Sequence, residues 1–422
     1  MSAPRPATDR VSSANLFGID PDLVADCIHC GLCLETCPTF VETGKEEESP
    51  RGRLLLMSGL ASGRWGALPE VLSHLDLCLG CRACETACPS GVQYGRILEG
   101  ARAVIEPGRD RPQNRLERFL VRHVLWRGAL LARLAVFYRL GRLWGPAWAL
   151  ARAQFLPRAW RDRFALAPRM ESSSQPHGRT IHRGHGPPVI LLRGCVARAV
   201  FPQTEAAMMD LLGAAGYTVS LADQPECCGA LAHHIGESDR ARRFARELFA
   251  TLPEDTPIVT TAAGCGAHLK GLSHLFTAEA DRDKAGETAG RTRDLTEALG
   301  EGPRPLAFRK GRQEKVIYQD ACHLRHGQDV TEQPRRLLRA AGAILEEVEE
   351  ADLCCGSAGT YNIAQAEMAA RLGRRKARLL STKGPRTVVT HNPGCLIQLQ
   401  THLAGEMKVV SLARFLADRL AV

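Results

Sequence analysis

Two short segments of the chain each carry four cysteines in the same order. Residues 27–38 read CIHCGLCLETCP, residues 78–89 read CLGCRACETACP, and both follow the pattern C-x-x-C-x-x-C-x-x-x-C-P. Thiolates are soft ligands, and a dense set of them selects iron–sulfur clusters or zinc. A zinc site is typically built from separate C-x-x-C pairs, whereas these segments have three closely spaced cysteines and a fourth before proline. The spacing therefore favours [4Fe–4S] clusters over zinc.

The duplication follows from how this ferredoxin-type pattern binds iron. Three closely spaced thiolates hold one cluster, and the cysteine before proline ligates the other cluster. One copy therefore cannot complete its own cluster. The predicted ligands are Cys27, Cys30, Cys33 and Cys88 for the first cluster, and Cys78, Cys81, Cys84 and Cys37 for the second. Gly31 and Gly80 let the backbone approach the inorganic sulfides closely.

The segment between the two motifs predicts the type of ferredoxin domain. It contains RGRLLLMSGLASG, which is typical of a helix. We therefore expect a helical ferredoxin domain rather than the small β-hairpin type. Arg51 and Arg53 in this segment have two open interpretations: they reduce the negative charge around the clusters, or they are solvated in a loop.

The other eight cysteines form a second repeat. The first set is Cys195, Cys227, Cys228 and Cys265, and the second set is Cys322, Cys354, Cys355 and Cys395. The surroundings correspond as well: VILLRGC matches VIYQDAC, and ECCGA matches LCCGS. In each set an apolar run leads into a cysteine, and a CCG segment and a second apolar run ending at Gly-Cys follow.

Short apolar strands that alternate with helices indicate parallel α/β units, and open α/β sheets place ligand sites at their strand ends. The predicted fold class is α+β / α/β, with a helical two-cluster ferredoxin domain followed by two repeated α/β CCG units packed pseudo-symmetrically. The predicted domains are the ferredoxin domain (1–110), a basic amphipathic helical bridge (111–168), a linker (169–187), the first CCG unit (188–300) and the second CCG unit (301–422). A further linker is predicted at AEADRDKAGETAGRTRD.

Together these motifs resemble the glycolate oxidase iron–sulfur subunit family, within the wider group of paired CCG proteins that includes a heterodisulfide reductase component. The most telling segments are CIHCGLCLETCPTF, SPRGR, CLGCRACETACPSGV, CCGSAGTY and GCGAHLK. The resemblance covers nearly the whole chain. It implies an electron-transfer subunit that serves FAD-binding glycolate oxidase subunits, which oxidise glycolate to glyoxylate, and passes electrons to a quinone or another acceptor.

The CCG units depart from the heterodisulfide reductase pattern in one position. Each unit of that pattern ends C-x-x-C, but here the last positions are His268 and Gln398. Each unit therefore keeps four cysteines rather than five. A further cluster, zinc, a redox-active disulfide and a scaffold of buried thiols all remain open for these units.

Several other function classes are weighed against this one. No G-x-G-x-x-G follows a strand, so we expect no dinucleotide site and no flavin in this chain, which should be inactive alone. The alternatives are the iron–sulfur subunit of a lactate or glycerol-3-phosphate dehydrogenase, a heterodisulfide-reductase-like thiol–disulfide enzyme, and an assembly scaffold. Asp320, His323 and His326 near Cys322 suggest acid–base chemistry as a minor alternative.

Composition bounds the location and the partners. The 422 residues include 16 cysteines and carry a formal net charge of +9. The first residues contain no apolar signal segment and no apolar run approaches a membrane span, so we expect a cytoplasmic protein with thiol ligands rather than disulfides. We see no nucleic-acid module. The stretch 118–161 is rich in Arg and Trp, which predicts peripheral contact with the cytoplasmic face of the inner membrane or a helical bridge between domains.

Overall fold

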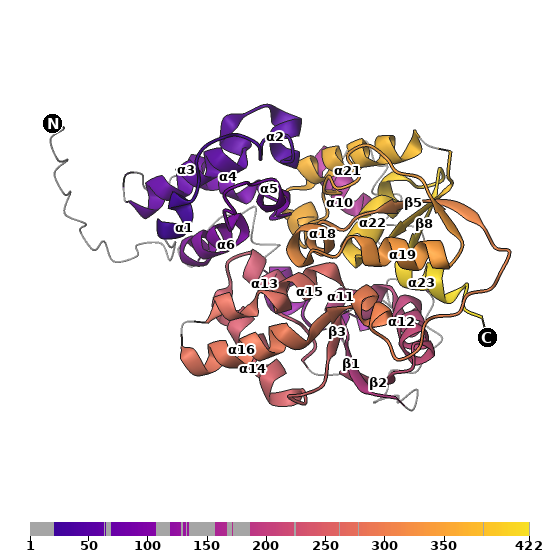
Figure 1. The fold of residues 1–422 in the computed structure, drawn as a ribbon. Coiled ribbons are helices and arrows are strands. Elements are labelled where there is room, and N and C mark those ends of the chain that lie inside the picture. Colours follow the sequence, from indigo (N-terminus) through magenta and orange to yellow (C-terminus); the bar gives the residue numbers. More distant parts are fainter. Residues whose placement is uncertain are drawn as a thin grey trace, which may run out of the picture.

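The structure is a computed structural model that describes residues 21–62, 64, 69–106, 119–127, 130–131, 133–134, 157–166, 171, 186–222, 225–260, 262–276, 278–382 and 384–421. Figure 1 shows three parts: a helical N-terminal part in indigo and purple, a first α/β unit in pink, and a second α/β unit in orange and yellow. Helices of the N-terminal part contact both units, with α6 against α13, α5 against α18 and α2 against α21.

The regular elements among the described residues of the N-terminal part are all helices, which confirms the predicted helical type. Its elements are α1 (Pro21–Ala25), α2 (Pro38–Thr43), η1 (Glu46–Glu48), α3 (Pro50–Ala61), α4 (Pro69–Asp76), α5 (Ala83–Thr86) and α6 (Tyr94–Ile105). Ser49 caps α3 by accepting a hydrogen bond from the Gly52 amide. Met57, Leu60 and Leu98 are buried in the core that these helices enclose.

The first α/β unit contains a parallel sheet in the order β2-β1-β3-β4. Its strands are β1 (Pro188–Leu192), β2 (Thr218–Ala222), β3 (Ile258–Thr260) and β4 (Thr292–Asp294). The helical elements are α11 (Cys195–Val200), α12 (Pro202–Ala214), α13 (Ala230–His234), α14 (Ser238–Thr251), α15 (Ala263–Lys270), η3 (Leu272–Leu275), α16 (Glu279–Arg291) and α17 (Leu295–Gly300). The apolar run of β1 is buried because helices cover both faces of a parallel sheet.

The second α/β unit repeats this topology, with its parallel strands in the order β6-β5-β7-β8. Its strands are β5 (Glu314–Gln319), β6 (Ala343–Leu345), β7 (Thr387–Thr390) and β8 (Lys408–Ser411). The helices are α18 (Cys322–Gln328), α19 (Glu332–Ala340), α20 (Tyr361–Ala364), α21 (Ala366–Ser381), α22 (Pro393–His402) and α23 (Leu412–Ala417). Two sheets with the same strand order confirm the predicted repeat and fold class.

The linker predicted at AEADRDKAGETAGRTRD is wrong, because this segment forms helix α16 and strand β4. The helix buries Ala285 and Thr288 and packs against α15 and η3. Such small buried side chains leave no apolar stripe in the sequence, so the segment resembled a polar linker. Strand β4 then pairs with β3 and completes the first sheet.

The two α/β units pack against each other through one apolar core. Val189 and Val259 of the first sheet belong to the same buried cluster as Val316 and Val389 of the second sheet. Helix α12 of the first unit packs against α23 of the second. The two repeats therefore pack together, as predicted, because the apolar faces of their strands are buried in one shared core.

The basic middle of the chain is described only in part. Trp144, Trp148 and almost all of the predicted linker 169–187 lie outside the described residues. Helix α10 (Arg158–Ala165) packs against α21, and Arg163 Nε donates to the carbonyl oxygen of Ile363 at 2.8 Å. Among the helices described, none combines the length and the apolar character needed to cross a bilayer.

Candidate metal centres

Four cysteines line one small cavity in the N-terminal part. Cys78, Cys81 and Cys84 come from the second motif, and Cys37 comes from the first. Cys37 is the N-cap residue of α2, whose first residue is Pro38, so the start of this helix fixes the position of the thiol. Crossed ligation requires this arrangement, because Cys37 must reach the three cysteines of the other motif. The assignment of all eight ligands stays a prediction.

The thiols of this cavity lie in a largely apolar environment. Burial raises the pKa of Cys84 well above its usual value, and burial together with the charge of Cys322 does the same for Cys81. Iron binding must displace these protons, so cluster assembly depends on pH. The Gly80 amide donates to Cys78 Sγ at 3.4 Å, and its φ of 65° is a left-handed conformation that glycine adopts at little cost.

The cysteines of the other predicted centre lie nearer the surface. Cys27, Cys33 and Cys88 pack against the apolar core of the N-terminal part, whereas Cys30 is exposed. Ile28 beside Cys30 is 67% exposed. The two predicted centres therefore differ in environment, one enclosed and one open to solvent on the Cys30 side.

A buried arginine lies beside the four-cysteine cavity. Arg53 donates to Glu48 Oε2 at 2.7 Å, to Thr39 Oγ1 at 3.0 Å and to the carbonyl oxygen of His74 at 2.7 Å. Its Nη1 lies 3.9 Å from Cys37 Sγ. Burial acts to lower the pKa of Arg53, but the nearby thiolates and Glu48 outweigh burial and raise it above its usual value. Arg53 therefore keeps its positive charge beside the cavity rather than in a solvated loop.

Arg51 is instead at the surface, where its Nε lies 2.6 Å from Glu46 Oε1.

Sequence reasoning missed two neighbours of the cavity, Glu48 and Tyr94. The hydroxyl of Tyr94 donates to Cys78 Sγ at 3.7 Å. Glu48 lies in the acidic run that directly precedes SPRGR, and this run could have suggested a carboxylate partner for Arg53.

The four cysteines of the second α/β unit also converge. They follow the carboxyl ends of β5, β6 and β7, as an open parallel sheet predicts for a ligand site. Cys322 Sγ and Cys354 Sγ are 4.0 Å apart, and Asn392 Nδ2 donates to Cys395 Sγ at 3.4 Å. Hydrogen bonds from Cys354 and Cys395 lower the pKa of Cys355 well below its usual value.

The first α/β unit repeats this chain of thiol contacts. Hydrogen bonds from Cys195 and Cys228 lower the pKa of Cys227, and Cys228 in turn contacts Cys265. Within the described part of the chain, no three or more Cys, His, Asp or Glu side chains are arranged to hold a single metal ion. A further cluster, zinc and a disulfide stay open predictions for both units.

The two residues that replace a fifth cysteine have other contacts. His268 is buried, and its Nδ1 lies 3.4 Å from His233 Nδ1. Gln398 donates through Nε2 to the carbonyl oxygen of Ala369 at 2.9 Å. Each side chain packs within its own unit, and Nε2 of His268 and Oε1 of Gln398 have no hydrogen-bond partner among the described residues.

The second α/β unit, unlike the first, places its thiols beside the four-cysteine cavity. Cys81 and Leu79 of the N-terminal part share one apolar cluster with Cys322 and Cys354. The hydroxyl of Tyr361 donates to the carbonyl oxygen of Leu77 at 3.0 Å across the same contact. In the first unit, Cys195 and Cys227 pack instead with Phe244 and the Trp126 ring.

The residues considered for acid–base chemistry also serve this contact. His323 Nε2 lies 3.1 Å from the carbonyl oxygen of Gly80, and His326 Nδ1 lies 2.8 Å from Thr86 Oγ1. Burial lowers the pKa of His323 to about 3, so its ring is neutral. Asp320 is held by two hydrogen bonds from Arg335, at 2.9 and 2.6 Å. These side chains join elements together rather than converge on a common point.

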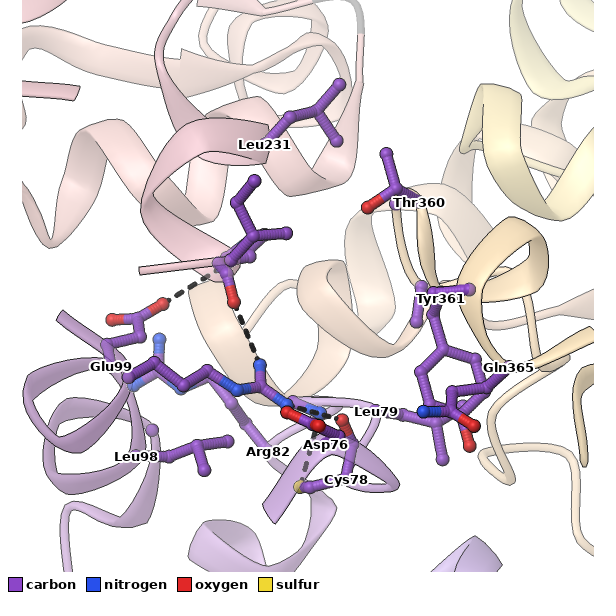
Figure 2. A pocket seen from close by; sticks show the side chains of 18 of the residues that line it. Asp76, Cys78, Leu79, Arg82, Leu98, Glu99, Leu231, Thr360, Tyr361 and Gln365 are labelled. Atoms are coloured by element: carbon purple, nitrogen blue, oxygen red, sulfur yellow. Dashed lines mark hydrogen bonds and ion pairs between the residues drawn. The ribbon is translucent and has the colours of Figure 1, made fainter. Parts of the chain in front are cut away.

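A pocket marks where all three parts meet. Figure 2 shows Asp76, Cys78 and Leu79 of the N-terminal part facing Leu231 of the first unit and Tyr361 of the second. Arg102 spans this junction, with hydrogen bonds to the carbonyl oxygens of Cys78 at 2.8 Å and of His234 at 2.9 Å. The loop of the second motif is therefore bonded directly to the second α/β unit and through Arg102 to the first.

Comparison with known proteins places the chain in a family. Residues 23–92 match the 4Fe-4S dicluster domain, and residues 189–270 and 316–400 match the Cysteine-rich domain called CCG. The probable glycolate oxidase iron-sulfur subunit of Bacillus subtilis (strain 168) is 34% identical over 95% of both chains. The chain belongs to the glycolate oxidase iron–sulfur subunit family. The resemblance inferred from the motifs is thus confirmed.

Two further relatives match this chain, one over most of its length and one over about half. The glycolate oxidase iron-sulfur subunit of Escherichia coli (strain K12) is 34% identical over 90% of this chain and 89% of its own. A fumarate reductase (CoM/CoB) subunit of Methanothermobacter marburgensis is 27% identical over 53% of this chain and 44% of its own. The four thiols of the enclosed cavity fit an iron–sulfur cluster, because soft donors surround a buried cavity beside a permanent positive charge.

Proposed function

We propose that this chain is the iron–sulfur electron-transfer subunit of a complex that oxidises glycolate to glyoxylate. The observation that carries the proposal is the cavity lined by Cys37, Cys78, Cys81 and Cys84, which adjoins the thiols of the second α/β unit. Relatives named as glycolate oxidase iron–sulfur subunits match this chain over nearly all of its length, whereas relatives with other names match about half. The lactate, glycerol-3-phosphate and thiol–disulfide alternatives are therefore not favoured.

The residues of the chain would bind the clusters and control their surroundings. Iron–sulfur clusters, when bound, accept and donate one electron at a time. Cys37 and the second motif supply the thiolates for the enclosed centre, and Cys27, Cys30, Cys33 and Cys88 supply those for the exposed centre. Arg53 holds a positive charge near Cys37, and Leu79 and Tyr361 exclude water from the contact with the second unit.

The sequence of this chain contains no recognisable dinucleotide-binding motif, so the oxidation of the hydroxy acid is assigned to a partner. We propose that an FAD-binding subunit oxidises the hydroxy acid and that this chain, inactive alone, passes the electrons to a quinone or another acceptor. We also propose the domain division given above. The Arg- and Trp-rich stretch 118–161 is proposed to touch an anionic membrane surface. Flotation with anionic and neutral liposomes tests that contact, and equal recovery at low and high salt would exclude an electrostatic attachment.

The experiment that tests the function measures glycolate-dependent reduction of a dye. The chain co-expressed with FAD-binding partners should support reduction, and the chain alone should not. Replacement of Cys81 by Ser should abolish the transfer, because it removes a predicted ligand of the enclosed centre. Dye reduction with glycolate by the isolated, flavin-free chain would contradict the subunit role and favour an independent enzyme.

A further inference from the structure

An open cavity of about 1,070 Å³ lies between the N-terminal part and the first α/β unit. Helix α6 forms one wall, α13, α14, α15 and η3 form the other, and His323 and Gly327 of α18 close one side. Cavities of this size at the junction of domains are the usual location of small-molecule sites. None of the roles assigned above uses this space.

The walls of the cavity are strongly basic. The cationic side chains that line it are Arg82, Arg96, Arg122, Arg240, Arg242, Arg243 and Lys270, and the acidic ones are Glu99, Glu106, Glu237 and Asp239. Most of these charges are already paired, since Glu237 binds Arg122 and Arg240, Asp239 binds Arg242, and Lys270 binds Glu297, which lies outside the lining. Arg96 of α6 and Arg243 of α14 line the cavity as exposed side chains, and neither forms an ion pair with another residue in the described part of the chain.

Like charges are crowded at one end of this cavity. His274, Arg96 and Arg82 line the same cavity, and the pKa of His274 is lowered first by burial and then by the positive charges of the two arginines. Arg82 reaches its own carboxylate partner, Glu85, at 2.8 Å outside the cavity lining. Repulsion between such neighbours is relieved when an anion binds between them.

The inner wall supplies unused hydrogen-bonding groups. His233 and His234 contact Glu99, at 3.7 and 3.0 Å. Nε2 of His234 and Nε2 of His268 are shielded from solvent and make no hydrogen bond to any described residue. His268 itself is only 7% exposed.

We propose that this cavity binds a small organic polyanion, a molecule with at least two carboxylate or phosphate groups. Two groups are needed because unpaired arginines lie on two walls, Arg96 on α6 and Arg243 on α14. Guanidinium groups bind carboxylate and phosphate oxygens through paired charge-assisted hydrogen bonds. The bound anion joins the N-terminal part to the first α/β unit, a role that does not depend on the proposed electron transfer.

Isothermal titration calorimetry on the full chain with reconstituted clusters tests the proposal. The probes are citrate and inorganic pyrophosphate, with sodium chloride of equal ionic strength as the reference. We expect saturable binding of at least one probe at low ionic strength, and the stronger probe identifies carboxylate or phosphate as the preferred group. The double variant Arg96→Gln/Arg243→Gln should bind about tenfold more weakly or worse.

A matched variant separates a site from general charge attraction. Arg336→Gln/Arg378→Gln removes two exposed arginines of the second α/β unit, so its net charge equals that of the test variant. Retained affinity in this control supports the cavity as the site. Equal weakening in both double variants, or no saturable heat with either probe, would overturn the proposal. Both measurements report anion binding alone, so a negative result would not bear on the proposed function, which the glycolate experiment tests separately.

Discussion

At the scale of single residues, the electrostatics of the four-cysteine cavity depend on one buried ion pair. Arg53 is fully buried and Glu48 nearly so, and His74 Nδ1 lies 2.6 Å from the other oxygen of Glu48. A buried pair of this kind adds little net stability compared with apolar residues, but removing one partner leaves the other charge buried and unpaired. Here the ion pair keeps the positive charge of Arg53 close to the four thiols of the cavity.

The substitution Arg53→Gln should therefore destabilise the protein and the enclosed centre together. It leaves Glu48 buried without its cation, which costs about 3–5 kcal/mol in the free energy of unfolding. Chemical denaturation measures the loss, with Arg51→Gln as the matched control because Arg51 is a surface residue paired with Glu46. A similar small effect of both substitutions would show that the buried charge is not needed.

Crossed ligation predicts an unequal effect of Cys37→Ser. The cluster held by Cys78, Cys81 and Cys84 should lose its signal or change it, because Cys37 lines their cavity, while the cluster of the first motif persists. Electron paramagnetic resonance of the reduced protein measures both. Cys88→Ser is the reciprocal control and should affect the first cluster. Loss confined to the first cluster in Cys37→Ser would rule out the crossing.

Sequence spacing predicts a grouping of the cysteines at this scale, and four of them, Cys37, Cys78, Cys81 and Cys84, line one cavity in the structure. It could not predict that Arg53 is buried, because its partners Glu48 and Thr39 and the His74 carbonyl come together only when α2, α3, α4 and η1 pack. Nor could it predict the roles of His323 and His326, whose partners are more than 200 residues away in sequence. Contacts between distant segments leave no local pattern.

At the scale of elements, a buried pair fixes how the two α/β units meet. Asp294 ends β4 and caps α17, and its Oδ2 lies 2.9 Å from Nε2 of His391, which follows β7 of the other unit. Burial acts to raise the pKa of Asp294, but the charge and hydrogen bond of His391 and the hydrogen bonds of Thr296 outweigh burial and lower it. The carboxylate is therefore favoured in the folded state.

This pKa shift predicts an acid-dependent contribution to stability. A carboxyl whose folded pKa lies below the unfolded value of about 3.9 stabilises the fold above that pH and loses this contribution as the pH falls toward the folded pKa. Asp294→Asn should lower the free energy of unfolding at neutral pH by about 3 kcal/mol and flatten its fall below about pH 4. Urea denaturation as a function of pH measures the difference between variant and wild type.

Asp239→Asn is the control for that measurement, because the Asp239 side chain is 95% exposed. Its unfolding curve should follow the wild type over the same pH range. An unchanged acid slope in Asp294→Asn would show that the pair between the units does not titrate with folding.

The elements themselves were largely predictable. The apolar runs before Cys195 and Cys322 predicted β1 and β5, and the repeat predicted that the remaining strands would correspond. Helix α16 was not predicted, since its buried face offers Ala285 and Thr288 rather than a stripe of large apolar side chains. Helix formation there depends on packing against α15 and η3, which composition does not reveal.

At the scale of the whole molecule, the two α/β units are alike in topology but unlike in position. The thiols of the second unit pack beside Cys81, whereas Cys195 and Cys227 of the first unit pack with Phe244 and Trp126. Equivalent cysteines should therefore have different effects on the enclosed centre. A repeat in sequence predicts equal folds, and the asymmetry arises only from where the N-terminal part docks.

Cys322→Ser should perturb the paramagnetic resonance signal of the enclosed centre, because Cys322 adjoins Cys81 in one apolar cluster. Cys195→Ser, the same change at the corresponding position of the first unit, should leave that signal unchanged. Reduced samples of both variants, compared at equal iron content, provide the measurement. Equal perturbation by both substitutions would contradict the one-sided contact.

The position of Cys37 in the cavity of the second motif also bears on biosynthesis. With crossed ligands, neither predicted centre has all four thiols until Cys84 has left the ribosome, and the first centre also requires Cys88, although the first three cysteines emerge about 50 residues earlier. Each completed centre then closes a loop of about 50 residues, which in a chain-entropy treatment removes about 4 kcal/mol of disorder from the unfolded chain. Cluster assembly on this chain would therefore require both motifs to be synthesised and brought together, and the bound clusters would then link the two motifs.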